Sequence, residues 1–259
     1  MTHDPVVFLP GMMCDARLFK QQMTDLSPDA SVTAAPITGG DRVEEIASSL
    51  LDVLPRRFAL AGLSMGGIVA MEILRRAPDR VSRIALMDTN PLAETPQSAT
   101  AYEPFIIKLR SGSLADAVQG FLLPEYLAPG TGRAAIIAEL TEMAENIGAD
   151  AIVRQVRALQ RRRDYQSVLR RCKVPTLVLC GRHDGLTLVK RHSFMADLIP
   201  YASLSVIEGA GHLPPMEAPE ATTAALRAWL EQPFVLQKRV DACCLLYTSD
   251  AADDVSTVY

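Results

Sequence analysis

The sequence predicts an α/β protein: one mostly parallel sheet of about six strands, with helices on both faces and a helical insertion. Three observations predict this class. Short apolar segments alternate with segments of helical periodicity, which is the pattern of βαβ units. Several apolar segments, such as Thr176–Cys180, are uninterrupted, as expected of strands covered on both faces. The length of 259 residues suits one α/β domain with an insertion.

The predicted strands are short apolar runs, several of them closed by glycine or proline. In chain order they are Val6–Leu9, Ser31–Ala35, Phe58–Leu63, Val81–Met87, Thr176–Cys180 and Leu204–Ile207. Because helical segments separate most of them, neighbouring strands are expected to run parallel.

Helices are predicted between these strands. Asp41 is the expected N-cap of a helix that ends at Leu54, and Glu44 completes a start that resembles a capping box. The next helix is predicted over Met65–Arg76. A last helix is predicted from about Glu217–Leu230. These helices would cover the two faces of the sheet.

Residues 91–171 break the alternation, because they show helical periodicity without a convincing strand. Apolar stripes over 136–147 and, after Gly148, over 152–159 indicate amphipathic helices. The segment is far longer than a crossover between parallel strands requires. We therefore interpret it as a helical cap, inserted into an α/β core formed by residues 1–90 and 172–233.

Five arginines gather at the end of this insertion. A charged run of this kind usually forms a solvated helix face, and attraction of an acidic substrate is the alternative. The five are Arg154, Arg157, Arg161, Arg162 and Arg163.

Composition excludes several classes of protein. The net charge of −4 gives no basic excess for nucleic acid or anionic lipid. The longest apolar runs are far shorter than a bilayer span, so no membrane association is expected. The N-terminus lacks a basic region followed by an apolar stretch, and the five cysteines form no regular framework. These features predict a cytoplasmic protein, and they leave a homodimer open.

Residues 238–259 fit no element of the predicted sheet. The run from Cys243 to Asp254 resembles translated adaptor sequence, so we expect a non-native or disordered tail. Cys243 and Cys244 lack a second pair of ligands, and no metal site is expected there.

A Gly-x-Ser-x-Gly motif lies directly between a predicted strand and a predicted helix. A serine at the apex of such a turn needs small residues two positions away on each side, which Gly62 and Gly66 provide. The helix N-terminus also favours the negative charge that develops during attack. This is the pattern of a nucleophile elbow, so Ser64 is the predicted nucleophile; the alternative is a plain glycine-rich turn.

A serine hydroxyl needs a base to take its proton, and the chain has four histidines. His212 lies in a glycine- and proline-rich loop after the last predicted strand, where parallel sheets gather reactive groups. His3 belongs to the N-terminus, His183 adjoins an acid candidate, and His192 lies in an amphipathic helix where a surface role is expected. His212 is therefore the predicted base.

Two aspartates are candidates for the carboxylate that orients the base. Asp184 follows the fifth predicted strand and Asp88 ends the fourth. Asp184 is favoured because its loop lies beside the strand that delivers His212, and the carboxylate must reach that ring. A turn or N-cap role is the alternative at either position.

The chain order Ser64, Asp184, His212 resembles the α/β-hydrolase superfamily, as does the segment Phe8–Met12 after the first strand. The resemblance covers about residues 5–230. Residues 61–67 and 209–219 are similar to bacterial esterases and lactonases, including enol-lactone hydrolases.

This resemblance implies the α/β-hydrolase fold, with the backbone N–H groups of Met12 and Met65 forming an oxyanion hole, and no metal or organic cofactor. Two departures stand out. Pro10-Gly11 occupies the place where the family often carries His-Gly, which keeps the backbone donor. The chain also begins at the third strand of the full family sheet, so antiparallel edge strands are expected to be missing.

By resemblance, the predicted protein is a serine hydrolase that cleaves a small carboxylic ester or lactone through an acyl-enzyme intermediate. Its expected partner is that small-molecule substrate. Carbon–carbon bond hydrolases, lyases and acyltransferases use the same scaffold, and a non-catalytic ligand-binding protein is a further alternative.

Overall fold

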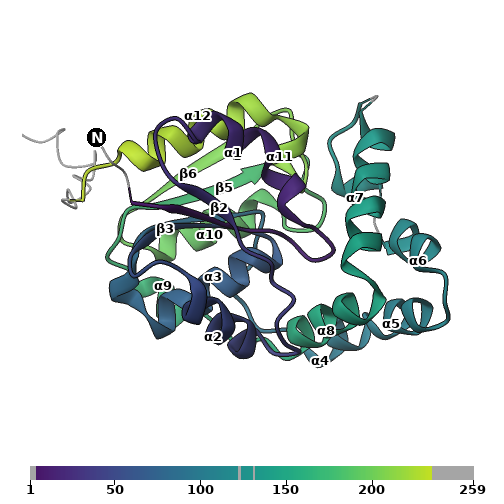
Figure 1. Cartoon of the computed structure of the whole chain (residues 1–259). Coiled ribbons are helices and arrows are strands. Elements are labelled where there is room, and N and C mark those ends of the chain that lie inside the picture. The colour runs from purple at the N-terminus through teal and green to yellow at the C-terminus, as the bar shows by residue number, and fades with distance from the viewer. Residues whose placement is uncertain (1–3, 122–123, 131, 235–259) are drawn as a thin grey trace, which may run out of the picture.

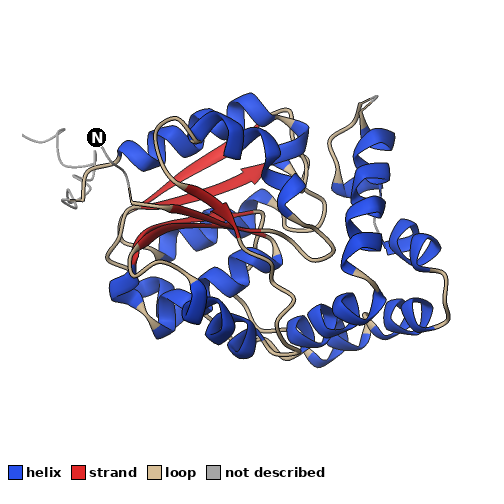
Figure 2. Ribbon diagram, in the orientation of Figure 1, coloured by secondary structure: helices blue, strands red, loops and turns tan. Residues whose placement is uncertain are grey.

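The computed structural model describes residues 4–121, 124–130 and 132–234. Its core is one sheet of six strands in the order β2-β1-β3-β4-β5-β6 (Figures 1 and 2). All five pairings are parallel, and the predicted fold class is confirmed. The strands are β1 Val6–Leu9, β2 Val32–Ala34, β3 Phe58–Leu63, β4 Val81–Met87, β5 Thr176–Gly181 and β6 Ala202–Ile207.

The strand order reverses between β1 and β3. The chain passes from β1 outward to β2 and then returns to β3 on the other side of β1. Leu9 at the end of β1 is therefore paired with Gly62 near the end of β3. The loops that follow β1 and β3 consequently meet at the carboxyl edge of the sheet, the usual place for ligands in open α/β sheets.

Helices cover both faces of the sheet (Figure 1). One face carries α1 Lys20–Leu26, α11 Pro214–Glu217 and α12 Pro219–Glu231. The other carries α2 Val43–Val53, α3 Met65–Arg76, α9 Gln166–Arg170 and α10 Val189–Leu198. β1, β3, β4 and β5 are buried along their whole length, as expected of strands covered on both faces, although β4 includes the polar residues Ser82 and Arg83.

The start of α2 differs from the prediction. The N-cap is Arg42 and not Asp41, and it makes no side-chain capping bond. The Asp41 carboxylate instead pairs with Arg161, at 3.0 Å, and its N–H donates to Glu45 Oε2 at 3.2 Å. The Asp41 side chain, which the local sequence predicts to cap the helix, is therefore engaged in an ion pair with a distant residue.

The elements assigned in the described part of the insertion are all helices, and they lie beyond the carboxyl ends of the strands (Figure 1). A separate apolar cluster joins α5, α6, α7 and α8, with Met13 from the core. The elements are α4 Pro96–Thr100, α5 Glu103–Arg110, α6 Leu114–Phe121, η3 Pro124–Tyr126, α7 Arg133–Ile147 and α8 Ala149–Gln160.

One helix of the predicted insertion belongs with the core. α9 packs against α3 and α10, and its Val168 and Leu169 join the apolar cluster beneath the sheet. We therefore propose that the cap ends with α8 and that the core resumes near Tyr165.

Two short 3-10 turns, η1 Ala16–Phe19 and η2 Pro78–Arg80, complete the assigned elements. Within the described ranges, none of the helices combines the length and apolar character that a bilayer crossing requires. The predicted tail, 238–259, with Cys243 and Cys244, lies outside the described residues.

Candidate active site

Ser64 occupies a strained turn between β3 and α3. Its φ of +53° lies in the left-handed region, which a residue with a side chain enters only when its surroundings hold it there. Its N–H donates to the carbonyl of Met87 at 2.8 Å, and its own carbonyl accepts from the Thr89 hydroxyl at 2.7 Å. Contacts with the Met87 carbonyl at the end of β4 and with the Thr89 hydroxyl just beyond it thus fix the turn.

The two glycines of the motif are required by close backbone packing. A Cβ atom on Gly62 would lie 2.3 Å from the carbonyl oxygen of Gly66. A Cβ atom on Gly66 would lie 2.1 Å from the carbonyl oxygen of Leu9. Both distances are far inside van der Waals contact, so the turn excludes side chains at these positions.

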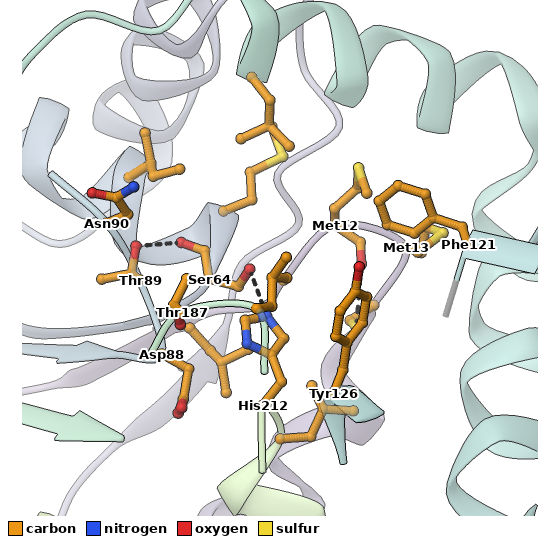
Figure 3. Close-up of a pocket in the computed structure, with 18 of the residues that line it drawn as sticks. Met12, Met13, Ser64, Asp88, Thr89, Asn90, Phe121, Tyr126, Thr187 and His212 are labelled. Carbon is orange, nitrogen blue, oxygen red and sulfur yellow. Dashed lines mark hydrogen bonds between the residues drawn. The ribbon is translucent and has the colours of Figure 1, made fainter. Parts of the chain in front are cut away.

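Three predicted site residues form one hydrogen-bonded chain. The Ser64 hydroxyl lies 3.0 Å from His212 Nε2 (Figure 3), and His212 Nδ1 lies 2.9 Å from Asp184 Oδ2. The His212 residue is 8% exposed and Asp184 is 2% exposed. Segments from three distant parts of the chain therefore place a hydroxyl, an imidazole and a carboxylate in line.

Asp184 sits in a nest of hydrogen-bond donors. Its carboxylate accepts from the N–H groups of Leu186, at 2.8 Å, and Thr187, at 2.9 Å, and from the Thr187 hydroxyl at 2.5 Å. Burial alone would raise the pKa of Asp184, but the His212 ring and the donors of Thr187 outweigh it and lower the pKa. Asp184 is consequently an ionised carboxylate facing the imidazole.

Asp88 lies behind Asp184 in a different electrostatic state. It is fully buried, and its Oδ1 accepts from the N–H of Gly181 at 3.0 Å. Burial, followed by the neighbouring charge of Asp184, raises the pKa of Asp88 well above its ordinary value. Ionising Asp88 beside the charge of Asp184 is therefore unfavourable.

Among the described residues, one group of side chains has the spacing of metal ligands. Single ligand atoms of Asp88, Asp184 and His212 lie within 4.8 Å of one another. Both His212 nitrogens already take part in hydrogen bonds, to Ser64 and to Asp184. This bonding favours a proton relay over a cation site.

The two predicted oxyanion donors line the same pocket as Ser64. Met65 is the first residue of α3, where backbone N–H groups lack a partner within the helix. Met12 follows β1, and the loop is held at Met13, whose N–H donates to Gln155 Oε1 of α8 at 3.1 Å. Gln155 was missed by the sequence analysis, although a polar residue within the apolar stripe 152–159 is a usable signal.

The loop that carries His212 is also fixed by distant groups. The His212 N–H donates to the carbonyl of Tyr126 in η3, at 2.7 Å. The Glu217 carboxylate accepts from the N–H groups of Gly211, at 2.9 Å, and Leu213, at 2.8 Å. His212 is thus positioned partly by the cap and partly by the half-buried carboxylate of Glu217 at the end of α11.

The surface role expected for His192 is wrong. This residue is fully buried, and its Nε2 accepts from the N–H of Thr89 at 3.1 Å. Burial lowers the pKa of His192 to about 4, so the ring is neutral near neutral pH. Because Thr89 also bonds to Ser64, His192 supports the nucleophile turn from behind.

A cavity of about 340 Å³ opens onto Ser64 and His212 (Figure 3). The core and the cap both contribute to its walls, which are mostly apolar. Its apolar lining includes Met12, Ile68, Phe121, Ile137, Leu140 and Leu159. The volume suits a small ligand.

The chain belongs to the Alpha/beta hydrolase family, whose model matches residues 6–226. Among its relatives, the pimeloyl-acyl-carrier-protein methyl ester esterase of Photobacterium profundum is 26% identical over 242 residues, covering 87% of this chain and 94% of the relative. The biotin biosynthesis bifunctional protein BioHC of Teredinibacter turnerae is 23% identical over 206 residues, covering 74% of this chain but 36% of that longer protein.

Solved structures show the same fold. A thermophilic esterase from Thermogutta terrifontis is similar with a TM-score of 0.80 and 28% identity, covering 88% of this chain and 90% of the esterase. The enol-lactonase of Burkholderia xenovorans LB400 has a TM-score of 0.76 and 23% identity, covering 89% of this chain and 92% of the lactonase. These similarities, with the family match, confirm the predicted membership of the α/β-hydrolase superfamily.

Proposed function

We propose that this chain is a serine hydrolase that cleaves a small carboxylic ester or lactone through an acyl-enzyme intermediate. The observation that carries the proposal is the relay from Ser64 through His212 to Asp184, at a strained strand-to-helix turn that opens onto a cavity. A nucleophile, a base and an orienting carboxylate are what acyl transfer by serine requires.

In the proposed mechanism, the Ser64 oxygen attacks the substrate carbonyl while His212 Nε2 takes its proton. Ionised Asp184 holds the ring through Nδ1 and stabilises the imidazolium. The N–H groups of Met65 and Met12 receive the charge of the tetrahedral intermediate, each worth about 3–4 kcal/mol of transition-state stabilisation. His212 then protonates the leaving alcohol.

Water resolves the acyl-enzyme in the second half of the reaction. His212 takes a proton from the water as it attacks the acyl carbon, and the proton returns to Ser64 when the acid leaves. Every step uses side chains and backbone groups of this chain, so the proposal includes no metal or organic cofactor.

The relatives support ester bonds as the target. The Photobacterium and Thermogutta proteins are both named esterases, and the second is 28% identical to this chain. The mostly apolar cavity supports a small organic substrate rather than a polymer.

Active-site labelling tests the nucleophile. A fluorophosphonate should add once to the intact protein, on the peptide that contains Ser64, and Ser64→Ala should abolish the adduct and lower kcat by about 10⁶-fold. Ser98 also lines the cavity but lies outside the relay, so Ser98→Ala is the matched control and should still be labelled. Labelling that persists in Ser64→Ala would contradict the assignment.

A p-nitrophenyl ester separates this proposal from the alternatives on the same scaffold. A serine hydrolase should release a burst of p-nitrophenol equal to the enzyme present and then turn over steadily. A non-catalytic ligand-binding protein would show no steady turnover. An acyltransferase would turn over faster with an added alcohol or thiol than with water alone.

A further inference from the structure

Four of the five arginines in the cluster fall into two groups. Three of its members form ion pairs outside the cavity: Arg157 with Glu103, Arg161 with Asp41 and Arg163 with Glu44. Arg162 instead lines the cavity that contains Ser64. The solvated face that the sequence predicted is therefore wrong for this one residue.

Arg162 is paired with Glu94 in the cavity wall. Its Nη2 lies 2.9 Å from Glu94 Oε1, and both side chains are 9% exposed. Its Nε donates to the carbonyl of Leu92 at 2.9 Å, and the hydroxyl of Ser98 donates to the Glu94 carboxylate. Glu94 and Ser98 line the same cavity, so a charged cluster interrupts an otherwise apolar wall.

Stability is a weak explanation for such a pair. Removing two charges from water costs about as much as their attraction returns, and apolar residues of similar shape are often as stable. A charged pair in the wall of a ligand cavity is better explained by what it contacts when the cavity is filled. Arg162 offers donors and Glu94 offers acceptor lone pairs, with no net charge between them.

The opposite charges of Arg162 and Glu94 limit which ligand groups the pair can bind. A substrate carboxylate would be attracted by Arg162 but repelled by Glu94, and a substrate ammonium would meet the reverse. An uncharged group that both donates and accepts hydrogen bonds satisfies both side chains without separating them.

We propose that the cavity selects esters or lactones that carry an uncharged hydrogen-bonding group, a hydroxyl or a primary amide, placed against the Arg162–Glu94 pair. This inference rests on the proposed hydrolase function and names its substrate class. It makes Arg162 and Glu94 specificity-determining residues that do not take part in the relay.

Two series of esters test the selection, one varied in the acyl part and one in the alcohol part. The acyl series is methyl hexanoate, its ω-hydroxyl derivative and monomethyl adipate. The alcohol series is pentyl acetate, its ω-hydroxyl derivative and the corresponding ω-carboxylate. Proton release gives kcat/KM for each ester without a chromogenic leaving group.

In one of the two series, the hydroxyl ester should exceed the alkyl ester by about tenfold or more in kcat/KM, because one hydrogen bond to a charged group is worth about this factor. The carboxylate ester should not exceed the hydroxyl ester in either series. A hydroxyl ester without advantage in both series, or a preferred carboxylate, would overturn the inference.

Neutralising Glu94 should change the preference in a predictable direction. Glu94→Gln keeps the shape of the side chain and leaves Arg162 as an uncompensated cation, so the carboxylate ester should gain about tenfold or more relative to the hydroxyl ester. Asp41→Asn neutralises the partner of Arg161 outside the cavity and is the matched control, for which the ratio should not move. An unchanged ratio in Glu94→Gln would contradict the inference.

A charge-free double variant covers the case in which an unpaired Arg162 destabilises the fold. Arg162→Met combined with Glu94→Met removes both charges together, and the ratio of hydroxyl to alkyl ester should fall to about one. A ratio retained in this variant would also overturn the inference. Fluorophosphonate labelling of Ser64 reports the proposed function separately, because it does not depend on the ester chosen.

Discussion

Asp88 and Asp184 end neighbouring strands of the same sheet and are both buried, yet they differ in charge. Asp184 follows β5 and accepts hydrogen bonds from Leu186, from Thr187 and from His212. Asp88 follows β4 and has one assigned donor, the N–H of Gly181. The pKa of Asp184 is lowered and that of Asp88 is raised.

The comparison shows that the facing His212 ring and the hydrogen-bond donors, rather than burial, separate the pKa values of the two carboxylates. Burial raises the pKa of both groups. The charge interaction with His212, together with the donors around Asp184, overcomes that effect, and the charge of Asp184 then adds to the cost of ionising Asp88. One carboxylate is thereby prepared to stabilise an imidazolium, while the other stays neutral behind it.

Of the two aspartates, Asp184 should have the larger effect on activity when it is neutralised. In Asp184→Asn the His212 ring loses its anionic partner and takes the wrong tautomer, which costs about 10⁴-fold in turnover in serine proteases with the same relay. Steady-state kcat on a p-nitrophenyl ester measures the loss, and circular dichroism verifies that the variant is folded. A near-normal kcat would show that Asp184 is not the carboxylate that orients His212.

The contribution of Asp88 to wild-type stability should depend on pH in the opposite sense to that of a salt-bridged acid. At pH values above the ordinary pKa of 3.8, the unfolded chain has lost the Asp88 proton, while the raised pKa favours its retention in the folded protein. Wild-type stability therefore falls as pH rises from 3.8 towards the pKa of folded Asp88. Asparagine has no such proton. The variant should therefore gain on the wild type by up to about 1.4 kcal/mol per pH unit.

Urea unfolding of both proteins between about pH 4.5 and pH 7.5 measures this gain. Asparagine tolerates the left-handed backbone at this position, where φ is +42°, and its side-chain oxygen can still accept from Gly181. A stability difference that stays constant across the range would mean that Asp88 ionises normally.

The smallest expected effect is that of Asp88→Asn on catalysis. Because Asp88 is already neutral beside Asp184, an amide of the same shape should reduce kcat by less than about tenfold. The comparison with Asp184→Asn must use the same ester and the same pH. If Asp88→Asn were the inactive variant and Asp184→Asn the active one, the two aspartates would exchange roles.

Features that depend on local sequence were predicted from the residues alone. The six strands and the helix after Ser64 follow from apolar runs and from the glycine and proline residues that end several of them. The observed boundaries differ from the predicted ones by no more than a few residues. The turn over Gly62–Gly66 could also be predicted, because its close backbone packing requires glycine at both positions. The order of Ser64, Asp184 and His212 along the chain then suggested the partners that the fold brings together.

Features that depend on contacts between distant segments were not accessible. His192 lies in an amphipathic helix like many surface histidines, and only the packing of α10 against the end of β4 buries it against Thr89. Arg162 stands between Arg161 and Arg163 in the sequence, yet it alone of these three turns into the cavity to meet Glu94.

Periodicity and turn chemistry are properties of neighbouring residues, so the parallel sheet, the helical insertion and the strand-to-helix turn at Ser64 could be predicted without a structure. The charge of a buried group is a property of all the atoms around it. Whether Asp88 is ionised, and whether Arg162 faces water or a ligand, depends on donors and counter-charges from segments far away in the chain. The tertiary structure sets those properties. In water, side chains of one type ionise alike, whereas burial removes that water and leaves each group to its own neighbours.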